Sequence, residues 1–340
     1  MQKTNENGNL IKTQRRLKRG YSFFGFGMMV CFFQCSSLAQ HYPAKPIKIT
    51  VGFSPGGIAD VSARLLAPQL AEILGQSVVI ENRPGASGAI ATEKVSMAAA
   101  DGYTLLAPTA ADTVIPALRK HLPYNLERDL SPVALVAIAP FILVVHPSVP
   151  VTNVKELIAL ARLRPGKLSY GSVGLGTTPH LSAEALKVMA TLDIVHIPYK
   201  GGLDNVIANA SGAVDMVFAS LPSLTPMIGS GHSRLKPLAV TSIKRASFMP
   251  QLPTMNESGV PGYDRSSWVG ILAPKNTSKD IISKLNAAII TAANNHAVKD
   301  SFNQQGLEPQ SLGVEQFGFF IKDQLEQNVK LIAIIGLKKD

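Results

Sequence analysis

Apolar and polar residues alternate over residues 47–51, and this period of two predicts a half-buried strand. Over 58–73 the apolar positions instead recur every three or four residues, which predicts a helix that ends at Gly75. Asp60, in the first turn of this helix, suits the positive end of the helix dipole, and Arg64 is spaced to pair with it. After residue 45 the chain therefore begins with a strand followed directly by a helix.

The same succession of strand and helix continues along the chain. An alanine-rich helix is predicted to run to about residue 100, and a glycine-rich turn precedes a later helix. The predicted strands are 47–51, 77–81, 103–107, 168–172, 194–197 and 214–219, and the other predicted helices are 179–189, 278–294 and 314–335. Strands that alternate with helices are typical of a mostly parallel, doubly wound sheet. Since 340 residues exceed the usual size of one domain, we predict an α/β fold with two lobes.

Two short apolar segments, 141–145 and 238–241, are predicted to cross between the lobes. The expected division therefore takes each lobe from separate stretches of sequence. Residues 40–141 with about 240–275 form lobe 1, residues 142–239 form lobe 2, and the helices of 276–340 pack on the lobes.

The first 39 residues differ from the rest. A basic stretch at 12–19 precedes an uncharged, mostly apolar run at 21–33, and Ser37-Leu38-Ala39 supplies small residues for cleavage. The apolar run is shorter than the about 20 residues that span a bilayer. We therefore predict a signal peptide cleaved after Ala39 and a periplasmic location, with an uncleaved anchor as the alternative. Arg15-Arg16 leaves the export route, Sec or twin-arginine, open.

Removal of this segment changes the bulk charge. The formal net charge of +10 falls to +5, because six of 33 Lys/Arg and one of 23 Asp/Glu lie in residues 1–39. The remainder shows no basic stripe with interleaved aromatic residues, so a nucleic-acid partner is not expected. Both cysteines, Cys31 and Cys35, lie in the leader, and the histidines lack metal-ligand spacing. We expect a monomer with no disulfide, no metal and no cofactor.

Residues 52–56 read G-x-S-x-G, the pattern of a hydrolase nucleophile on a turn between strand and helix. In that turn the residue after the serine donates its main-chain N–H to the oxyanion hole. Here that residue is Pro55, which has no N–H. A serine hydrolase that uses Ser54 is therefore kept only as an unfavoured alternative.

The same turn also has the features of an anion-binding loop. Gly56 and Gly57 let the backbone approach a ligand, and the N–H groups of the following helix point beyond the carboxyl end of the strand. The glycine-rich turn at 172–178 repeats this arrangement later in the chain. For either loop alone, glycine that serves turn geometry only is the simpler interpretation.

Longer stretches resemble the Bug family, the periplasmic solute receptors of tripartite tricarboxylate transporters. They include YPAKPIKITVGFSPGGIADVSARLLA from Tyr42, LGQSVVIENRPGASGAIATEKV from Leu74 and LSYGSVGLGTTPHLSAEALK from Leu168. The similarity covers the chain after the leader, in order. It implies a type II periplasmic-binding fold, with two doubly wound lobes and a hinge that close on a small carboxylate.

The resemblance also implies the ligand-binding residues. In such receptors the first loop and the second glycine-rich loop bind the carboxylate through main-chain N–H groups and ordered water. The corresponding residues here are Phe53, Ser54, Gly56, Gly57, Thr109, Ser172, Gly174, Gly176, Thr177 and Ser220. Ser54 replaces a common proline, and Ala219 stands where the family often has a polar or acidic residue.

The predicted function is therefore capture of a small carboxylate for uptake, with no catalysis. Membrane permease subunits are the expected partners. An accessory role for a membrane sensor kinase is the alternative. His180 either contacts the anion or caps its own turn, Lys200 is expected in solvent, and Trp268 is expected in the core or near the cleft.

Overall fold

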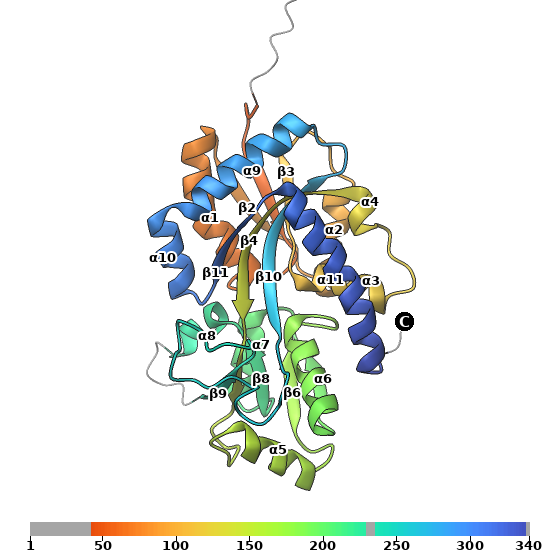
Figure 1. Cartoon of the computed structure of the whole chain (residues 1–340), viewed down its shortest axis with the longest axis vertical. Helices are drawn as coiled ribbons and strands as arrows, with labels where there is room; N and C mark the ends of the chain where they lie inside the picture. The colour runs from red at the N-terminus through yellow and green to blue at the C-terminus, as the bar shows by residue number, and fades with distance from the viewer. Residues whose placement is uncertain (1–41, 229–234, 338–340) are drawn as a thin grey trace, which may run out of the picture. The chain divides into compact units, whose positions relative to one another are not determined.

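The computed structural model describes residues 42–228 and 235–337, and the two sheets of this part are shown in Figure 1. The predicted signal peptide, with Cys31 and Cys35, lies outside the described residues. Among the residues described, no helix is both long and apolar enough to cross a membrane.

The first sheet has six strands in the order β11-β4-β10-β3-β1-β2. Its β1, β2 and β3 are parallel, while β10 is antiparallel to β3 and β4, and β11 is antiparallel to β4. The strands are β1 (Ile47–Val51), β2 (Val78–Asn82), β3 (Thr104–Ala107), β4 (Leu130–Pro140), β10 (Ser266–Pro274) and β11 (Glu308–Leu312).

Helices cover both faces of this sheet (Figure 1). α1 and α9 pack together on one face, and α2, α3 and α11 lie on the other. The bounds are α1 (Ile58–Leu74), a 3-10 turn (Ala86–Gly88), α2 (Ala89–Ser96), α3 (Ala110–Leu118), α4 (Leu126–Asp129), α9 (Lys279–Asn294), α10 (His296–Gln304) and α11 (Val314–Ile334).

The second sheet has five strands in the order β7-β6-β8-β5-β9. β6 is parallel to β7 and β8, whereas β5 is antiparallel to β8 and β9. The elements are β5 (Ile142–Val145), β6 (Ser169–Ser172), β7 (Val195–Pro198), β8 (Met216–Ala219), β9 (Lys236–Val240), α5 (Val154–Leu163), α6 (Thr178–Ala190), α7 (Gly202–Ala210) and α8 (Leu221–Ile228).

The local rules that predicted the first helix account for its structure. α1 ends at Leu74 because Gly75 adopts the left-handed conformation, with φ of 67°, that glycine takes most easily. The carboxylate of Asp60 accepts hydrogen bonds from Arg64 and from the N–H of Gly56. The predicted pair of Asp60 and Arg64 is confirmed, and it ties the helix to the loop before it.

The predicted α/β class and the alternation of elements are confirmed, but three details differ. The sheets are mixed rather than mostly parallel, because β4, β5, β9, β10 and β11 pair antiparallel. The alanine-rich helix ends at Ser96, earlier than about residue 100, and a strand, β11, lies within the stretch predicted as C-terminal helices.

The two sheets are connected at Phe141 and Thr241. β4 of the first sheet ends at Pro140, and β5 of the second sheet begins at Ile142. The main-chain N–H of Phe141 donates to Thr241 Oγ1 at 2.8 Å, and the N–H of Thr241 donates to the carbonyl of Phe141 at 2.9 Å. Because both predicted crossing segments meet at Phe141 and Thr241, we expect this residue pair to be the hinge. The boundaries of the lobes stay a prediction.

We expect Thr241→Val to lower the free energy of unfolding by about 1–2 kcal/mol. Valine keeps the shape of the buried threonine but leaves the buried N–H of Phe141 without its acceptor. Urea denaturation measures the change, with Thr241→Ser, which keeps the hydroxyl, as the control. Equal stability of the valine variant and the native chain would contradict the role of this hydrogen bond.

Candidate functional site

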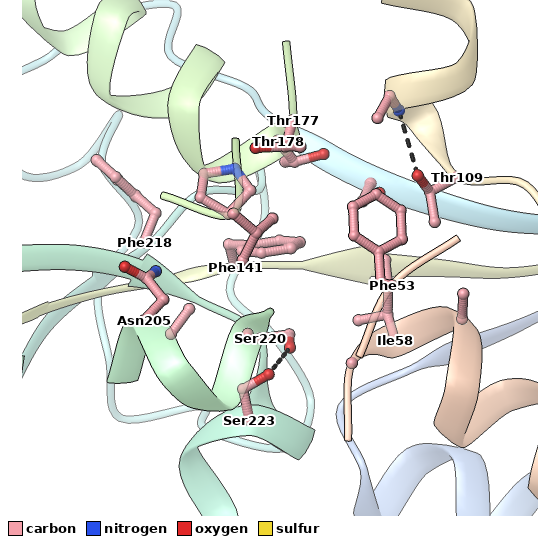
Figure 2. A pocket seen from close by; sticks show the side chains of 18 residues that line it. Phe53, Ile58, Thr109, Phe141, Thr177, Thr178, Asn205, Phe218, Ser220 and Ser223 are labelled. Atoms are coloured by element: carbon pink, nitrogen blue, oxygen red, sulfur yellow. Dashed lines mark hydrogen bonds between the residues drawn. The ribbon is translucent and has the colours of Figure 1, made fainter. Parts of the chain in front are cut away.

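One pocket lies where the first turns of five helices meet, α1 and α3 from beside the first sheet and α6, α7 and α8 from beside the second. Figure 2 shows side chains from both groups of helices around it. Its lining residues are Phe53, Gly57, Ile58, Ala59, Thr109, Ala111, Phe141, Val173, Thr177, Thr178, Pro179, Gly202, Asn205, Phe218, Ala219, Ser220, Ser223 and Ser267. Helix N-termini carry partial positive charge and unpaired N–H donors, so their convergence favours an anionic ligand.

Three of these helices begin without a side-chain cap. The residues at their N-caps are Gly57 for α1, Thr177 for α6 and Gly201 for α7, and no side chain accepts a hydrogen bond from the first N–H groups there. Thr177 Oγ1 instead donates to the carbonyl of Gly174 at 2.6 Å. By contrast α5, α9 and α10, which lie away from the pocket, are each capped by a side chain. α3, at the pocket, is capped by Thr109, and α2 and α11, away from it, are also uncapped. Three uncapped N-termini nevertheless meet at this one pocket.

The pocket walls are mainly apolar. Its apolar lining side chains include those of Phe53, Ile58, Phe141 and Phe218, which are labelled in Figure 2, together with that of Val173. The cavity volume is about 50 Å³, which favours a small molecule as its occupant.

Hydroxyl and amide groups complete the lining. Ser220 Oγ and Ser223 Oγ are 3.0 Å apart, and both are buried. Thr109 Oγ1 accepts the N–H of Ala111 at the start of α3. Asn205 is buried, and its Oδ1 has no hydrogen-bond partner. These groups supply short-range donors and acceptors without a formal charge.

No lysine, arginine, histidine, aspartate or glutamate lines the pocket in the described part of the chain. Asp112, the acidic residue of α3, is buried and accepts a hydrogen bond from the N–H of Thr109. Burial raises the pKa of Asp112 to about 6, although hydrogen bonds from Thr92 and from the N–H of Thr109 oppose this effect. The helix ends are therefore the main source of positive potential in the site.

Five of the ten residues predicted from sequence line the pocket: Phe53, Gly57, Thr109, Thr177 and Ser220. The other five lie in the same two loops but outside the lining. They are Ser54, Gly56, Ser172, Gly174 and Gly176. The structure thus brings both predicted loops to one pocket, and the part of each residue in binding stays a prediction.

Several of the residues outside the lining contact the opposite side of the pocket. A Cβ added to Gly201 would lie 2.7 Å from the Cβ of Ser54, and one added to Gly174 would lie 2.6 Å from Ser87 Oγ. Ser223 Oγ lies 3.4 Å from the carbonyl oxygen of Gly56. The first loop and the elements of the second sheet are therefore in direct contact, as in a closed clamp.

Two histidines support the second glycine-rich loop. The N–H of Gly176 donates to Nδ1 of His180 at 3.3 Å, so this nitrogen is unprotonated. Nε2 of His196 lies 2.6 Å from Ser172 Oγ, which in turn accepts the N–H of Gly174 at 3.0 Å. His180 caps its own turn, and it does not line the pocket.

The pKa of His180 lies below its usual value. Burial, followed by the nearby His196, lowers it to about 4, and burial also lowers the pKa of His196. Glu184, whose carboxylate binds Lys187 and the Tyr170 hydroxyl, opposes the shift in both histidines. The loop is thus built on histidines that are neutral near pH 7.

We expect His180→Gln to reduce the acid sensitivity of the fold. Between pH 6.5 and 4 the unfolded chain binds a proton at His180 that the folded chain does not, so stability falls as the pH falls through this range. From pH 7 to 5 the loss from this residue is roughly 2 kcal/mol, from about 1.4 kcal/mol per pH unit. Urea denaturation at both pH values measures it.

Glutamine can still accept the N–H of Gly176 but does not titrate. If the stability of the variant depends on pH in the same way as that of the native chain, protonation of His180 does not cause the loss of stability at low pH. His196 and Glu184 are present in both chains, and because they are electrostatically coupled to His180 the difference between the chains includes that coupling.

Sequence reasoning missed 13 of the 18 residues that line the pocket. Among them are Ile58, Phe141, Thr178, Asn205, Phe218 and Ser223. Ile58 is the first residue of α1, directly after the first predicted loop, and Thr178, the last residue of the second predicted loop, is the first residue of α6. Extending the predicted binding residues by one position toward the helix in each loop would have found both.

Two other predicted placements are settled. Trp268 is in the core, 2% exposed, with its ring edge-on to Phe317 and Phe320. Lys200 is exposed, as expected. No hydrogen bond joins Ser54 to a histidine within 42–228 and 235–337.

A pocket between two α/β sheets, lined by helix N-termini, is the arrangement expected of a protein that binds a small solute. Residues 62–337 match the sequence pattern of the family described as tripartite tricarboxylate transporter family receptor. The chain belongs to this family, as the resemblance predicted.

Individual proteins agree with this assignment. BugT of Bordetella pertussis is 37% identical over 302 residues, which cover 88% of this chain and 92% of BugT. Among solved structures, R. palustris Rpa4515 with adipate superposes with a TM-score of 0.85 at 34% sequence identity. The periplasmic binding protein BugD superposes with a TM-score of 0.83 at 32% sequence identity. Each match covers 88% of this chain and 100% of the matched chain. MatC of Rhodopseudomonas palustris with bound malate has 0.80 at 26%, covering 86% of this chain and 100% of MatC. The predicted periplasmic-binding fold is confirmed.

Proposed function

We propose that this protein is a periplasmic receptor that holds a small carboxylate in the pocket between its two sheets and delivers it to a membrane transporter. The observation that carries the proposal is the convergence of three uncapped helix N-termini, those of α1, α6 and α7, on one pocket. The solved relatives hold adipate and malate, which are carboxylates, and this supports the same ligand class here.

The ligand carboxylate binds the N–H groups that follow Gly57 and Thr177, with the hydroxyls of Thr109, Ser220 and Ser223 beside it. One helix terminus contributes about 0.3–1 kcal/mol, or up to about 2 kcal/mol when partly buried. Micromolar affinity needs about 8 kcal/mol. Both sides of the pocket must therefore contribute, and the two lobes close around the ligand by rotation at Phe141 and Thr241.

The protein has no reaction to perform in this proposal. Ser54 is packed against Gly201, and Pro55 offers no N–H for an oxyanion hole. The receptor acts as a monomer after cleavage of residues 1–39, and permease subunits are its partners.

A thermal-shift screen of the purified exported chain against mono-, di- and tricarboxylates and aromatic acids tests the proposal. A bound acid raises the melting temperature, by mass action on the folded state. X-ray scattering with and without that acid then tests closure, which reduces the radius of gyration. If no acid in the set raises the melting temperature, the proposed function is wrong; an unchanged radius with a bound acid contradicts closure only.

A further inference from the structure

We infer that Asn205 of α7 is a specificity-determining residue: its side-chain N–H donates a hydrogen bond to an oxygen on the carbon chain of the bound acid. The oxygen belongs to a hydroxyl, a keto or a second carboxyl group. The inference rests on the proposed function, because it concerns a ligand contact in the same pocket. It follows from the burial of this amide, from its packing and from its lack of hydrogen bonds.

The side-chain amide of Asn205 has no hydrogen-bonding role in the fold. Asn205 is 1% exposed, and it lines the pocket. Within residues 42–228 and 235–337, its Oδ1 has no hydrogen-bond partner, and its Nδ2 donates to no other group. Burial removes the hydrogen bonds that an amide makes to water, so buried amides are nearly always paired within the protein or with a bound molecule. A ligand oxygen in the pocket supplies the partner that the fold does not.

Packing against the second sheet fixes the orientation of this amide. Oδ1 of Asn205 lies against the backbone of Gly171 in β6, where an added Cβ would collide with it and lie 3.2 Å from Val217. A glycine inside a strand often marks such a close approach. Because Oδ1 is held against the strand, Nδ2 on the other branch of the amide is the group that faces the pocket.

Asn209, one helical turn later on α7, provides a structural comparison. Residues four apart lie on the same face of a helix. Asn209 is also buried, but its Nδ2 donates to the carbonyl of Val214 at 3.0 Å, and it does not line the pocket. The fold therefore uses the amide N–H of Asn209 and leaves that of Asn205 free for a ligand.

Asn205 lies across the pocket from the first loop. Figure 2 shows its side chain on the same side as Phe218 and Ser223, with Phe53 and Thr109 on the opposite side. A carboxylate bound at the start of α1 leaves its carbon chain between these two sides. An oxygen on that chain accepts the N–H of Nδ2, whereas a methyl or methylene group in its place leaves the amide unpaired. A site that hydrogen-bonds a ligand oxygen discriminates strongly against the analogue that lacks it.

Matched pairs of ligands test the inference on the native chain. The pairs are butanoate with succinate, hexanoate with adipate, and succinate with L-malate, and the second acid of each pair carries the additional oxygen group. Titration calorimetry gives the affinity ratio within a pair. We expect the second acid to bind about tenfold or more tightly in at least one pair. If acids bind but no pair shows this preference, the inference is wrong and the proposed function stands.

Two substitutions test whether Asn205 causes the preference. Asn205→Ala is expected to reduce the affinity ratio about tenfold, because it removes the hydrogen bond to the ligand oxygen. Asn205→Leu refills the space of the amide, so that a water molecule cannot take its place, and is expected to cause a similar loss. Asn209→Ala is the matched control, which removes a structural amide from the same helix and should lower stability without changing the ratio.

The outcomes separate this inference from the proposed function. A folded Asn205 variant with the native ratios, or an equal change of ratio in Asn209→Ala, would overturn the inference alone. If neither Asn205 variant folds, or if the screen yields only other acids, a crystal structure with the bound acid decides. Nδ2 of Asn205 without a ligand oxygen within hydrogen-bond distance would then overturn it. Failure of every acid in the pairs and in the wider screen would reject the proposed function and this inference together.

Discussion

Ile58→Pro is expected to weaken binding of the captured acid about ten- to a hundredfold while the protein keeps its fold. Ile58 is the first residue of α1 and lines the pocket. Proline removes its N–H, which has no partner within the helix, yet proline is well tolerated at this first helical position. Gly57 before it is extended, with φ of −84° and ψ of 171°, a conformation that a following proline accepts. A hydrogen bond to a charged group contributes about 1.5–3 kcal/mol, which sets the expected loss.

The matched control is Ile58→Val, which shortens the side chain to a similar degree but keeps the N–H. Titration calorimetry with the acid found in the screen measures both variants, and circular dichroism checks that each is folded. Equal affinities of the proline and valine variants would mean that the N-terminus of α1 does not hold the carboxylate.

Gly201→Ala is expected to weaken binding about tenfold or more, because it interferes with the closed state. The φ of Gly201 is −157°, so alanine causes no backbone strain there. Its Cβ would, however, lie 2.7 Å from the Cβ of Ser54 on the other side of the pocket. Overpacking of this kind costs about 1–3 kcal/mol. In an open state the two loops separate, so the cost falls on the closed, ligand-bound form.

A second substitution tests this explanation. Ser54→Gly removes the Cβ that alanine would meet, so the double variant Ser54→Gly/Gly201→Ala should recover much of the lost affinity. The single variant Ser54→Gly is measured to correct for the loss of the serine itself. No recovery in the double variant would show that Gly201 acts in some way other than through this contact.

Much of the fold was predictable because its signals are local. Three examples depend only on residues within one or two helical turns. They are the change from strand to helix periodicity near Ile58, the end of the helix at Gly75 and the glycine-rich turn before α6. β4 and β10 were not predicted because their sequences contain long apolar runs, such as Val133–Ala137, that show no clear period. Their antiparallel pairing joins segments more than 100 residues apart, which no local pattern encodes.

The site was predictable to the extent that its chemistry is carried by glycine-rich loops. Phe53, Gly57 and Thr177 lie at the strand-to-helix turns that the sequence marks. Asn205 and Phe218 reach the pocket only because the second sheet places α7 and β8 beside it, and neither residue type indicates binding alone. The neutrality of the lining is likewise visible only after the chain has folded.

In the proposed binding mode the chemical groups that hold the acid belong to the backbone, and this affects how such a receptor can evolve. A point substitution replaces a side chain but, except with proline, leaves the N–H of that residue in place. Mutations at Phe141, Phe218 or Ala219 can therefore alter which carbon skeleton is accepted, while the attachment of the carboxylate persists. Receptors with this scaffold can therefore change ligand specificity through single substitutions. No intermediate variant needs to lose its affinity for carboxylates.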